Sequence, residues 1–143
     1  MTVAKLTQGR SHDVVTVNEA STVHDATRLL EQYRIGALPV VDSNNSLCGI
    51  LSERDIVQAI ARNGAGILSR PVSAFMTADV ITCSRGDTVA NVSAVMTKGK
   101  FRHVPIVEDG QLVDIISIGD VVKYRIEQAE SEAAAMREYI TTG

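Results

Sequence analysis

The chain contains one pattern twice, and this repetition constrains its fold more than any other feature. The motif Asp13-Val14-Val15-Thr16 recurs as Asp79-Val80-Ile81-Thr82, and an apolar segment around Pro39 recurs around Pro105. The offset is 66 residues between the first motifs and 65 residues between the Ser-x-x-Asp motifs that end each copy. Any site in one copy should therefore have a pseudo-symmetric counterpart in the other.

Each copy predicts the order strand, helix, strand, strand, helix. The first strands are expected at Val14–Val17 and Val80–Cys83, followed by helices for which Ser21 and Asp87 are suitable N-caps. Apolar residues spaced three or four apart predict one buried face on each helix: Val23, Ala26, Leu29, Leu30 and Tyr33 in the first copy, and Val89, Val92, Val95 and Met96 in the second.

A hairpin and a last helix complete each copy. The Asp109-Gly110 pair is a strong signal for the tight turn of the second hairpin. Short leading helices are also expected at Val3–Leu6 and Val72–Phe75. The strands and last helices are predicted at Ala37–Val41, Leu47–Ser52 and Glu53–Arg62 in the first copy, and at His103–Val107, Leu112–Ser117 and from Gly119 onward in the second.

Strands this short cannot form a stable unit alone, so the two copies should share one core. The predicted fold is α+β, with two pseudo-symmetric β-α-β-β-α repeats packed sheet to sheet. The expected boundaries are residues 3–62 for the first repeat, 63–71 for a linker, 72–126 for the second repeat and 127–143 for a helical tail.

Composition excludes several classes of function. A net charge of −3 over 143 residues and the absence of Trp argue against general nucleic-acid binding. No apolar run is long enough to span a bilayer, and the first residues lack the pattern of a signal peptide, which predicts a cytoplasmic protein that does not bind membranes. Cys48 and Cys83 are isolated, so buried small hydrophobic residues are the favoured interpretation over a metal or redox role.

The repeated unit, with its Pro-Val/Ile-Val strand and terminal Ser-x-x-Asp, resembles the cystathionine beta-synthase (CBS) domain. Two copies in tandem resemble a CBS pair, the Bateman module, from about Val3 to Ile126. The resemblance implies a sensor that binds adenosine-containing ligands (AMP, ADP, ATP, NAD or S-adenosylmethionine) in two clefts between the repeats. One departure is that the hairpin glycine, Gly49, becomes Asp114 in the second copy, where a carboxylate close to a phosphate would repel it.

The motifs Ser52-x-x-Asp55 and Ser117-x-x-Asp120 stand where a strand turns into a helix, and they have two interpretations. One is a capping box, in which each side chain accepts a hydrogen bond from the other residue's backbone. The other is that the Asp accepts both hydroxyls of a ribose while the helix N-terminus favours a phosphate. The duplication and the resemblance together favour ribose binding.

The resemblance also implies the remaining members of each cleft. The Asp55 cleft would contain Ile81, Thr82, Phe101, Arg102, Ser52, Arg54 and Asp55. The Asp120 cleft would contain Val15, Thr16, Ile35, Gly36, His103, Ser117, Ile118, Gly119 and Asp120.

The two clefts should differ chemically. Lys100, Arg102 and His103 form a candidate phosphate-binding cluster, with a solvated charge cluster at a helix end as the alternative. Gly36 and Ala37 replace Arg102 and His103 in the first copy. Gly119 stands where the first copy has Arg54, which suggests a close approach of ligand to backbone, so we expect the Asp120 cleft to be the first occupied.

The tail carries apolar residues at heptad-like steps of four and three: Val122, Ile126, Ala129, Ala133, Met136 and Ile140. This stripe either packs on its own module or forms a seam with another molecule, and a homodimer is expected.

The leading hypothesis is a stand-alone regulatory module that binds an adenine nucleotide and signals to a protein partner by a change of conformation. The alternative is a structural protein-interaction module that binds no nucleotide. No catalytic triad, metal-ligand spacing or phosphate-binding loop is recognisable, so we predict no enzymatic activity, no catalytic cofactor and no metal site.

Overall fold

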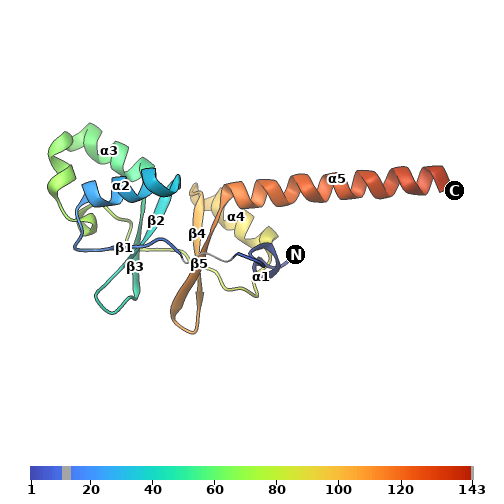
Figure 1. Ribbon diagram of the computed structural model, residues 1–143, viewed down its shortest axis with the longest axis horizontal. Helices are drawn as coiled ribbons and strands as arrows, with labels where there is room; N and C mark the ends of the chain where they lie inside the picture. The colour runs from blue at the N-terminus through green and yellow to red at the C-terminus, as the bar shows by residue number, and fades with distance from the viewer. Residues whose placement is uncertain (11–13, 143) are drawn as a thin grey trace.

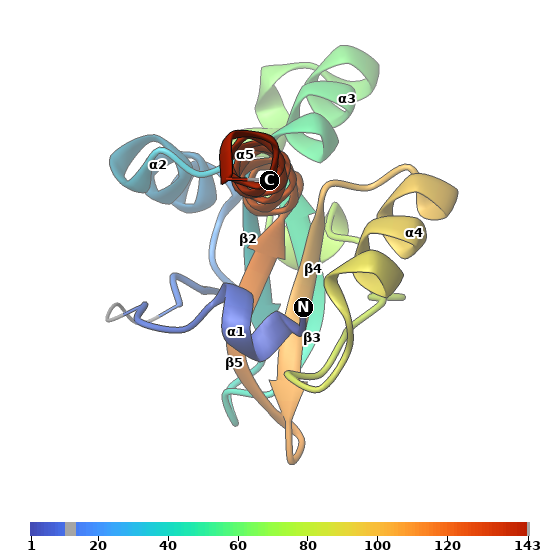
Figure 2. The same cartoon turned by 90° about the vertical axis from the view of Figure 1, so that its right-hand side faces the viewer.

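The computed structural model describes residues 1–10 and 14–142 and shows two halves, each with a small sheet and flanking helices (Figure 1). The first sheet has the order β1-β2-β3, with β1 (Val17–Asn18) parallel to β2 (Ala37–Val41) and β3 (Leu47–Ser52) antiparallel to it. The second sheet pairs β4 (His103–Glu108) with β5 (Gln111–Ser117) in antiparallel fashion. Figure 2 shows one sheet in front of the other, which agrees with the predicted α+β class.

Helices cover the sheets and join the two halves. The α-helices of the halves pack through the apolar faces that their spacing predicts, with Val23, Ala26 and Leu30 buried in the first half and Val89, Val92 and Met96 in the second. The elements are α1 (Val3–Leu6), α2 (Val23–Tyr33), α3 (Glu53–Asn63), the 3-10 helices η1 (Ala65–Ser69) and η2 (Val72–Ala74), α4 (Val89–Gly99) and α5 (Ile118–Thr142).

The predicted first strands are shorter than expected. In the first half only Val17–Asn18 forms β1, and in the second half the strand is reduced to Cys83, which makes one parallel bridge with Ile106. Val14, Val15, Val80 and Ile81, which were predicted in these strands, lie outside the sheets and line the clefts described below, so tertiary context overrides their preference for strands. Asp13, where the first repeat motif begins, lies outside the described residues.

The predicted N-caps, Ser21 and Asp87, are wrong by one residue. Thr22 and Thr88 cap α2 and α4, each accepting a hydrogen bond at its hydroxyl from the backbone N–H three residues later. The carbonyl groups of Ser21 and Asp87 instead accept backbone hydrogen bonds from the leading segment of the other repeat, at 2.8 Å in both cases.

The leading segments are exchanged between the halves. Val3 of α1 is buried in the core of the second half, and its N–H donates to Asp87. Val72 of η2 is buried in the core of the first half, and its N–H donates to Ser21. Each repeat therefore completes the core of the other, and α1 lies beside the second half in Figure 1.

The second hairpin turn forms as predicted. Asp109 and Gly110 both have positive φ, 51° and 79°, as a type I′ turn requires. The two hairpins hold the Ser-x-x-Asp motifs at the ends of β3 and β5, where α3 and α5 begin.

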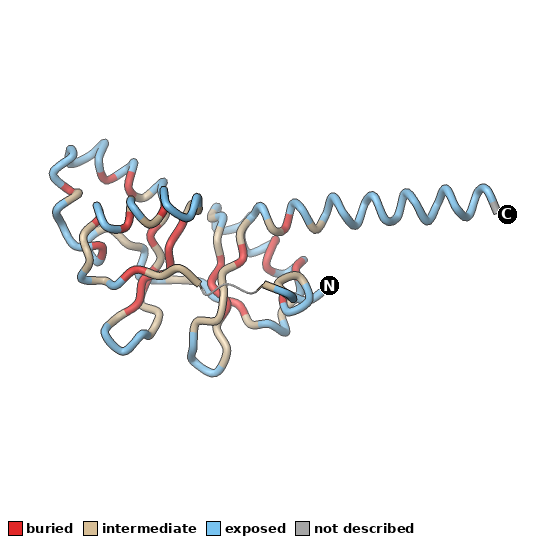
Figure 3. The backbone as a smooth tube through the Cα atoms, viewed as in Figure 1, coloured by how far each residue is buried: buried red, intermediate tan, exposed pale blue. Residues whose placement is uncertain are grey.

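Helix α5 continues without interruption from the second half into the tail and runs away from the body (Figure 1). Val121 is buried, Tyr124 packs against the core, and Arg125 Nη2 donates to Ser93 Oγ at 3.0 Å. Every residue from Ile126 to Thr141 is exposed (Figure 3). The interpretation that the tail packs on its own module is therefore wrong.

Candidate functional site

Two clefts lie between the halves, one beside each Ser-x-x-Asp motif. The first has a volume of about 230 Å³ and contains six of the seven residues predicted for the Asp55 cleft: Ser52, Arg54, Asp55, Ile81, Phe101 and Arg102. Thr82 is not among its lining residues. Thr77 and Asp79, which sequence reasoning missed, also line it; the antiparallel bridge between Thr77 and Ile50 brings this segment to the cleft.

The second cleft, of about 480 Å³, contains six of the nine residues predicted for the Asp120 cleft: Val15, Ile35, Gly36, His103, Ser117 and Asp120. Thr16, Ile118 and Gly119 do not line it. Arg10 and Asp114 line it, although neither was predicted as a site residue.

The two clefts adjoin at His103. Gly36, Ala37 and His103 line both of them. A Cβ atom added to Gly36 would lie 3.3 Å from His103 Cε1, so the absence of a side chain at residue 36 leaves room for the imidazole ring. The first copy has Gly36 and Ala37 where the second copy has Arg102 and His103. Only the second half therefore supplies an imidazole ring, and this ring packs against Gly36.

Both Ser-x-x-Asp motifs form capping boxes. Asp55 Oδ2 accepts from the Ser52 N–H at 2.9 Å, and the Asp55 N–H donates to Ser52 Oγ at 3.1 Å. Asp120 Oδ2 accepts from the Ser117 N–H at 2.8 Å, and the return bond is 3.2 Å. Each box uses Oδ2 of its aspartate, so a ligand hydroxyl would have to bind at Oδ1 or share Oδ2.

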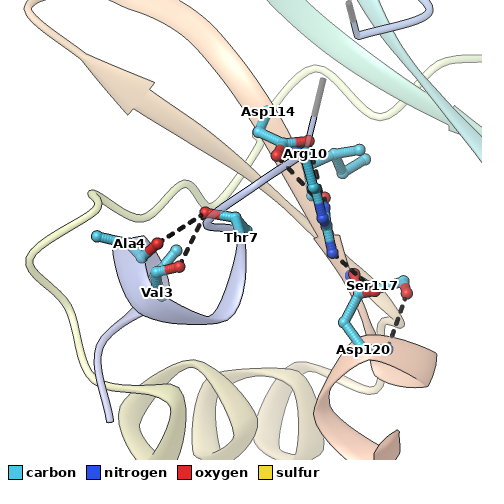
Figure 4. Close-up of polar contacts among 8 residues, drawn as sticks. Val3, Ala4, Thr7, Arg10, Asp114, Ser117 and Asp120 are labelled. Carbon is cyan, nitrogen blue, oxygen red and sulfur yellow. Dashed lines mark hydrogen bonds and ion pairs between the residues drawn. The ribbon is translucent and has the colours of Figure 1, made fainter. Parts of the chain in front are cut away.

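Arg10 distinguishes the clefts, because its guanidinium group contacts the Asp120 carboxylate (Figure 4). Arg10 Nη2 lies 2.8 Å from Asp120 Oδ1, while Nη1 lies 3.3 Å from Asp114 Oδ2 and donates to the Ile115 carbonyl at 3.1 Å. Asp55 Oδ1 has no such partner within residues 1–10 and 14–142.

The replacement of Gly49 by Asp114 explains this difference. In the first half, Ile50 pairs through its backbone with Thr77, and a Cβ on Gly49 would lie 2.5 Å from Met76 Sδ. In the second half, Arg10 Nη1 donates to the carbonyl group of Ile115, which is the counterpart of Ile50. The Asp114 carboxylate is thus paired with a cation inside the protein.

The pKa values of Asp120 and His103 are shifted by burial and by these contacts. Burial alone would raise the pKa of Asp120, but the Ser117 N–H and the Arg10 guanidinium outweigh it and lower the pKa below its usual value. Burial lowers the pKa of His103, and the carboxylates of Glu53 and Asp120 oppose this only in part. At neutral pH His103 is therefore neutral, and its imidazole ring can both donate and accept a hydrogen bond.

The Asp55 cleft retains the other predicted cations. Lys100 and Arg102 line it together with Arg54, and all three are exposed. Lys100 ends α4 in the left-handed conformation, which turns the chain toward β4 and places Arg102 at the cleft. Glu53 and Asp79 also line this cleft, so its charges are mixed.

The cysteines do not contribute to either cleft. Burial is the main reason that the pKa of Cys48 and that of Cys83 are both raised to about 11, which keeps the thiols protonated. Within the described ranges, no group of three or more His, Cys, Asp or Glu is placed to hold a metal ion.

Comparison with known proteins agrees with the geometry. The CBS domain family model matches the chain twice, at residues 10–62 and 72–127. The chain belongs to the CBS domain family.

Several relatives resemble this CBS pair over most of its length. CBS domain-containing protein CBSX3, mitochondrial, from Arabidopsis thaliana is 32% identical over 85% of the chain. CBS domain-containing protein YhcV from Bacillus subtilis is 31% identical over 85% of the chain and 83% of its own length. The CBS pair spans 61% of the length of CBSX3 and 23% of another Arabidopsis relative, CBSCBSPB1.

Solved structures share the fold. A CBS-domain containing protein from Agrobacterium tumefaciens is 43% identical, covers 87% of this chain and 92% of its own, and has a TM-score of 0.83. The CBS domain pair of protein MJ0100, solved with 5-methylthioadenosine and S-adenosyl-L-methionine, is 26% identical over 90% of this chain and 98% of its own, with a TM-score of 0.80. Among the described residues, no helix is both long and apolar enough to cross a membrane.

Proposed function

We propose that this CBS pair is a regulatory module that binds an adenosine-containing ligand first in the Asp55 cleft. The observation that carries the proposal is that Asp55 stands at the N-terminus of α3 with Oδ1 unpartnered in the described chain, while Arg10 holds the equivalent atom of Asp120. The larger volume of the Asp120 cleft would favour the opposite order. The unpaired carboxylate outweighs the difference in volume, because a ribose diol needs an acceptor that is not already paired.

The chemistry of the Asp55 cleft suits a nucleotide. Its apolar members, Ile50, Ile81 and Phe101, offer a surface for a base, while Arg54 and Arg102 are donors for a phosphate or carboxylate. The MJ0100 neighbour, which holds ligands containing adenosine, supports this class. The candidate ligands are AMP, ADP, ATP, NAD and S-adenosylmethionine.

The cleft also provides a way to signal. Ser52 to Asp55 come from the first half, and Phe101 and Arg102 come from the second. A ligand that contacts both halves favours the relative position in which both contacts are made, and this shifts the population of conformations that a protein partner can recognise.

Isothermal titration of the full chain with the five ligands tests the proposal. Asp55→Asn should weaken binding of the recognised ligand by tenfold or more, about 1.4 kcal/mol. Asp25→Asn is a matched control, because Asp25 forms the same capping box with Thr22 but lines neither cleft.

Two outcomes would reject the proposal. One is the absence of heat for all five ligands at millimolar concentration. The other is equal binding by the chain and Asp55→Asn. The first result would favour the alternative in which the motifs are only helix caps and the protein is a structural interaction module, whereas the second would show that the ligand binds without the Asp55 carboxylate.

A further inference from the structure

The part of α5 that leaves the body presents an apolar stripe that no described residue covers. The larger members of this α5 stripe are Val122, Ile126, Met136 and Ile140, which are 48%, 54%, 60% and 70% exposed. Ala129 and Ala133 lie between them and complete a heptad spacing. Most helical stability in proteins comes from packing of an apolar face, so an extended helix with an exposed apolar stripe indicates a missing partner.

The stripe is on a different side of α5 from the body. Val121, Tyr124 and Arg125 face the second half, through burial or through the hydrogen bond to Ser93. At 3.6 residues per turn, the centre of the stripe lies about 110° around the helix from these residues. A second helix therefore reaches the stripe without displacing the body.

The charged residues that flank the α5 stripe indicate which kind of partner helix it binds. With Ile126 at heptad position a, the flanking positions carry Arg125 and Glu132 at g, and Glu130 and Arg137 at e. Neither glutamate has a Lys or Arg three or four residues away on the same helix, and Arg137 has no acidic residue at those spacings. A second chain can supply complementary charges at these positions.

A parallel copy of the same helix supplies these charges. In a parallel pair, position g faces the next position e of the partner, which places Arg125 opposite Glu130 and Glu132 opposite Arg137. In an antiparallel pair with the tails fully overlapped, Glu130 faces Glu130 and Glu132 faces Glu132. A shift by one heptad in either direction removes this repulsion, but one shift sets Ile140 opposite Ile115, which belongs to strand β5 of the body, and the other sets Ile126 opposite Gly143 and so shortens the apolar seam.

We propose that the α5 stripe binds the same helix of a second copy of this chain in a parallel two-stranded coiled coil. The proposal is independent of ligand binding. The small Ala129 and Ala133 at its centre let the helices approach closely but bury little area. The dimer is therefore weak and sensitive to single charge changes.

Cysteine cross-linking tests the geometry. Ala129→Cys should form a disulfide-linked dimer under mild oxidation, since equivalent d positions meet in a parallel pair. Ser131→Cys, on the opposite side of the helix, is the matched control and should not cross-link; nor should the unmodified chain, which contains only Cys48 and Cys83. Cross-linking only in a mixture of Ala129→Cys and Ala133→Cys chains would show an antiparallel pair and overturn the proposal.

Sedimentation of the full chain tests the surface and the charges. Ile126→Lys should abolish the dimer, and Glu132→Arg or Arg137→Glu alone should weaken it about fivefold, whereas the double exchange should restore it. A monomer at about 100 µM, or a dimer unaffected by Ile126→Lys, would refute the proposal. Because these residues are exposed, the variants should keep the melting temperature and nucleotide affinity of the body.

Discussion

Replacing Arg10 by glutamine removes the guanidinium group that joins Asp120, Asp114 and the Ile115 carbonyl. A ribose diol that binds Asp120 Oδ1 must first displace this group. We therefore expect Arg10→Gln to raise the affinity of the Asp120 cleft for an uncharged nucleoside such as 5′-methylthioadenosine. A nucleoside without phosphate is the right probe, because the unpaired Asp114 would repel a phosphate.

The magnitude follows from the contact. The Arg10 and Asp120 side chains are 24% and 28% exposed, so the pair is neither fully solvated nor fully buried. An exposed ion pair contributes less than about 1 kcal/mol, and a hydrogen bond to a charged group contributes about 1.5–3 kcal/mol. A value of about 1–2 kcal/mol between these ranges predicts a gain in affinity of about 5- to 30-fold.

Isothermal titration in an Asp55→Asn background isolates the Asp120 cleft. Arg28→Gln is the matched control, since Arg28 is exposed on α2, lines neither cleft and changes the net charge by the same amount. Unchanged or weaker binding of the nucleoside by Arg10→Gln would refute the idea that Arg10 competes with the ribose. Weaker binding would instead indicate that Arg10 is itself a ligand-binding residue.

Three further predictions concern stability. Gly49→Ala should lower the free energy of unfolding by about 1–3 kcal/mol in urea titrations, because its Cβ would meet Met76 Sδ at 2.5 Å, whereas Gly66→Ala, with open space, should cost less than about 0.5 kcal/mol. The lowered pKa of His103 makes the folded protein lose stability as the pH falls from about 6.5 toward that pKa, so His103→Gln should flatten the pH dependence of urea unfolding between about pH 7 and 5. The lowered pKa of Asp120 contributes stability above about pH 4 that is lost as the pH falls through the folded-state pKa. The difference in melting temperature between the chain and Asp120→Asn should therefore close under acid, and a constant difference would contradict this account.

Local chemistry explains which parts of the fold were predictable. The hairpin strands, the Asp109-Gly110 turn and the buried face of α2 follow from residues within one turn or one hairpin of each other. The first strands and the N-caps were misplaced, because the backbone groups around Ser21 and Asp87 bond to the exchanged leading segments. Those bonds join residues about 50 to 80 positions apart, which no local pattern records.

The candidate site was likewise predictable only in part from the sequence. The repeat singled out Asp55 and Asp120, and most of the residues that the family resemblance grouped with each of them line the same cleft in the structure. Arg10 was not predicted as a site residue, because it is a single charged residue that lies outside both repeat motifs. One feature of the sequence could have indicated Arg10. Asp114 replaces the Gly49 of the first copy, and this additional carboxylate pairs with a cation in the structure.

The sequence by itself determined the duplicated architecture, the family and the positions of the two capping aspartates, since these depend on periodicity and on motifs a few residues long. Only the tertiary structure decided that the two clefts differ in the availability of their carboxylates. The reason is that Arg10 meets Asp114 from 104 residues away, and this contact exists only when the leading segment packs on the opposite repeat. The exposure of the α5 stripe is likewise a tertiary fact, because the sequence pattern fits an intramolecular and an intermolecular partner equally well.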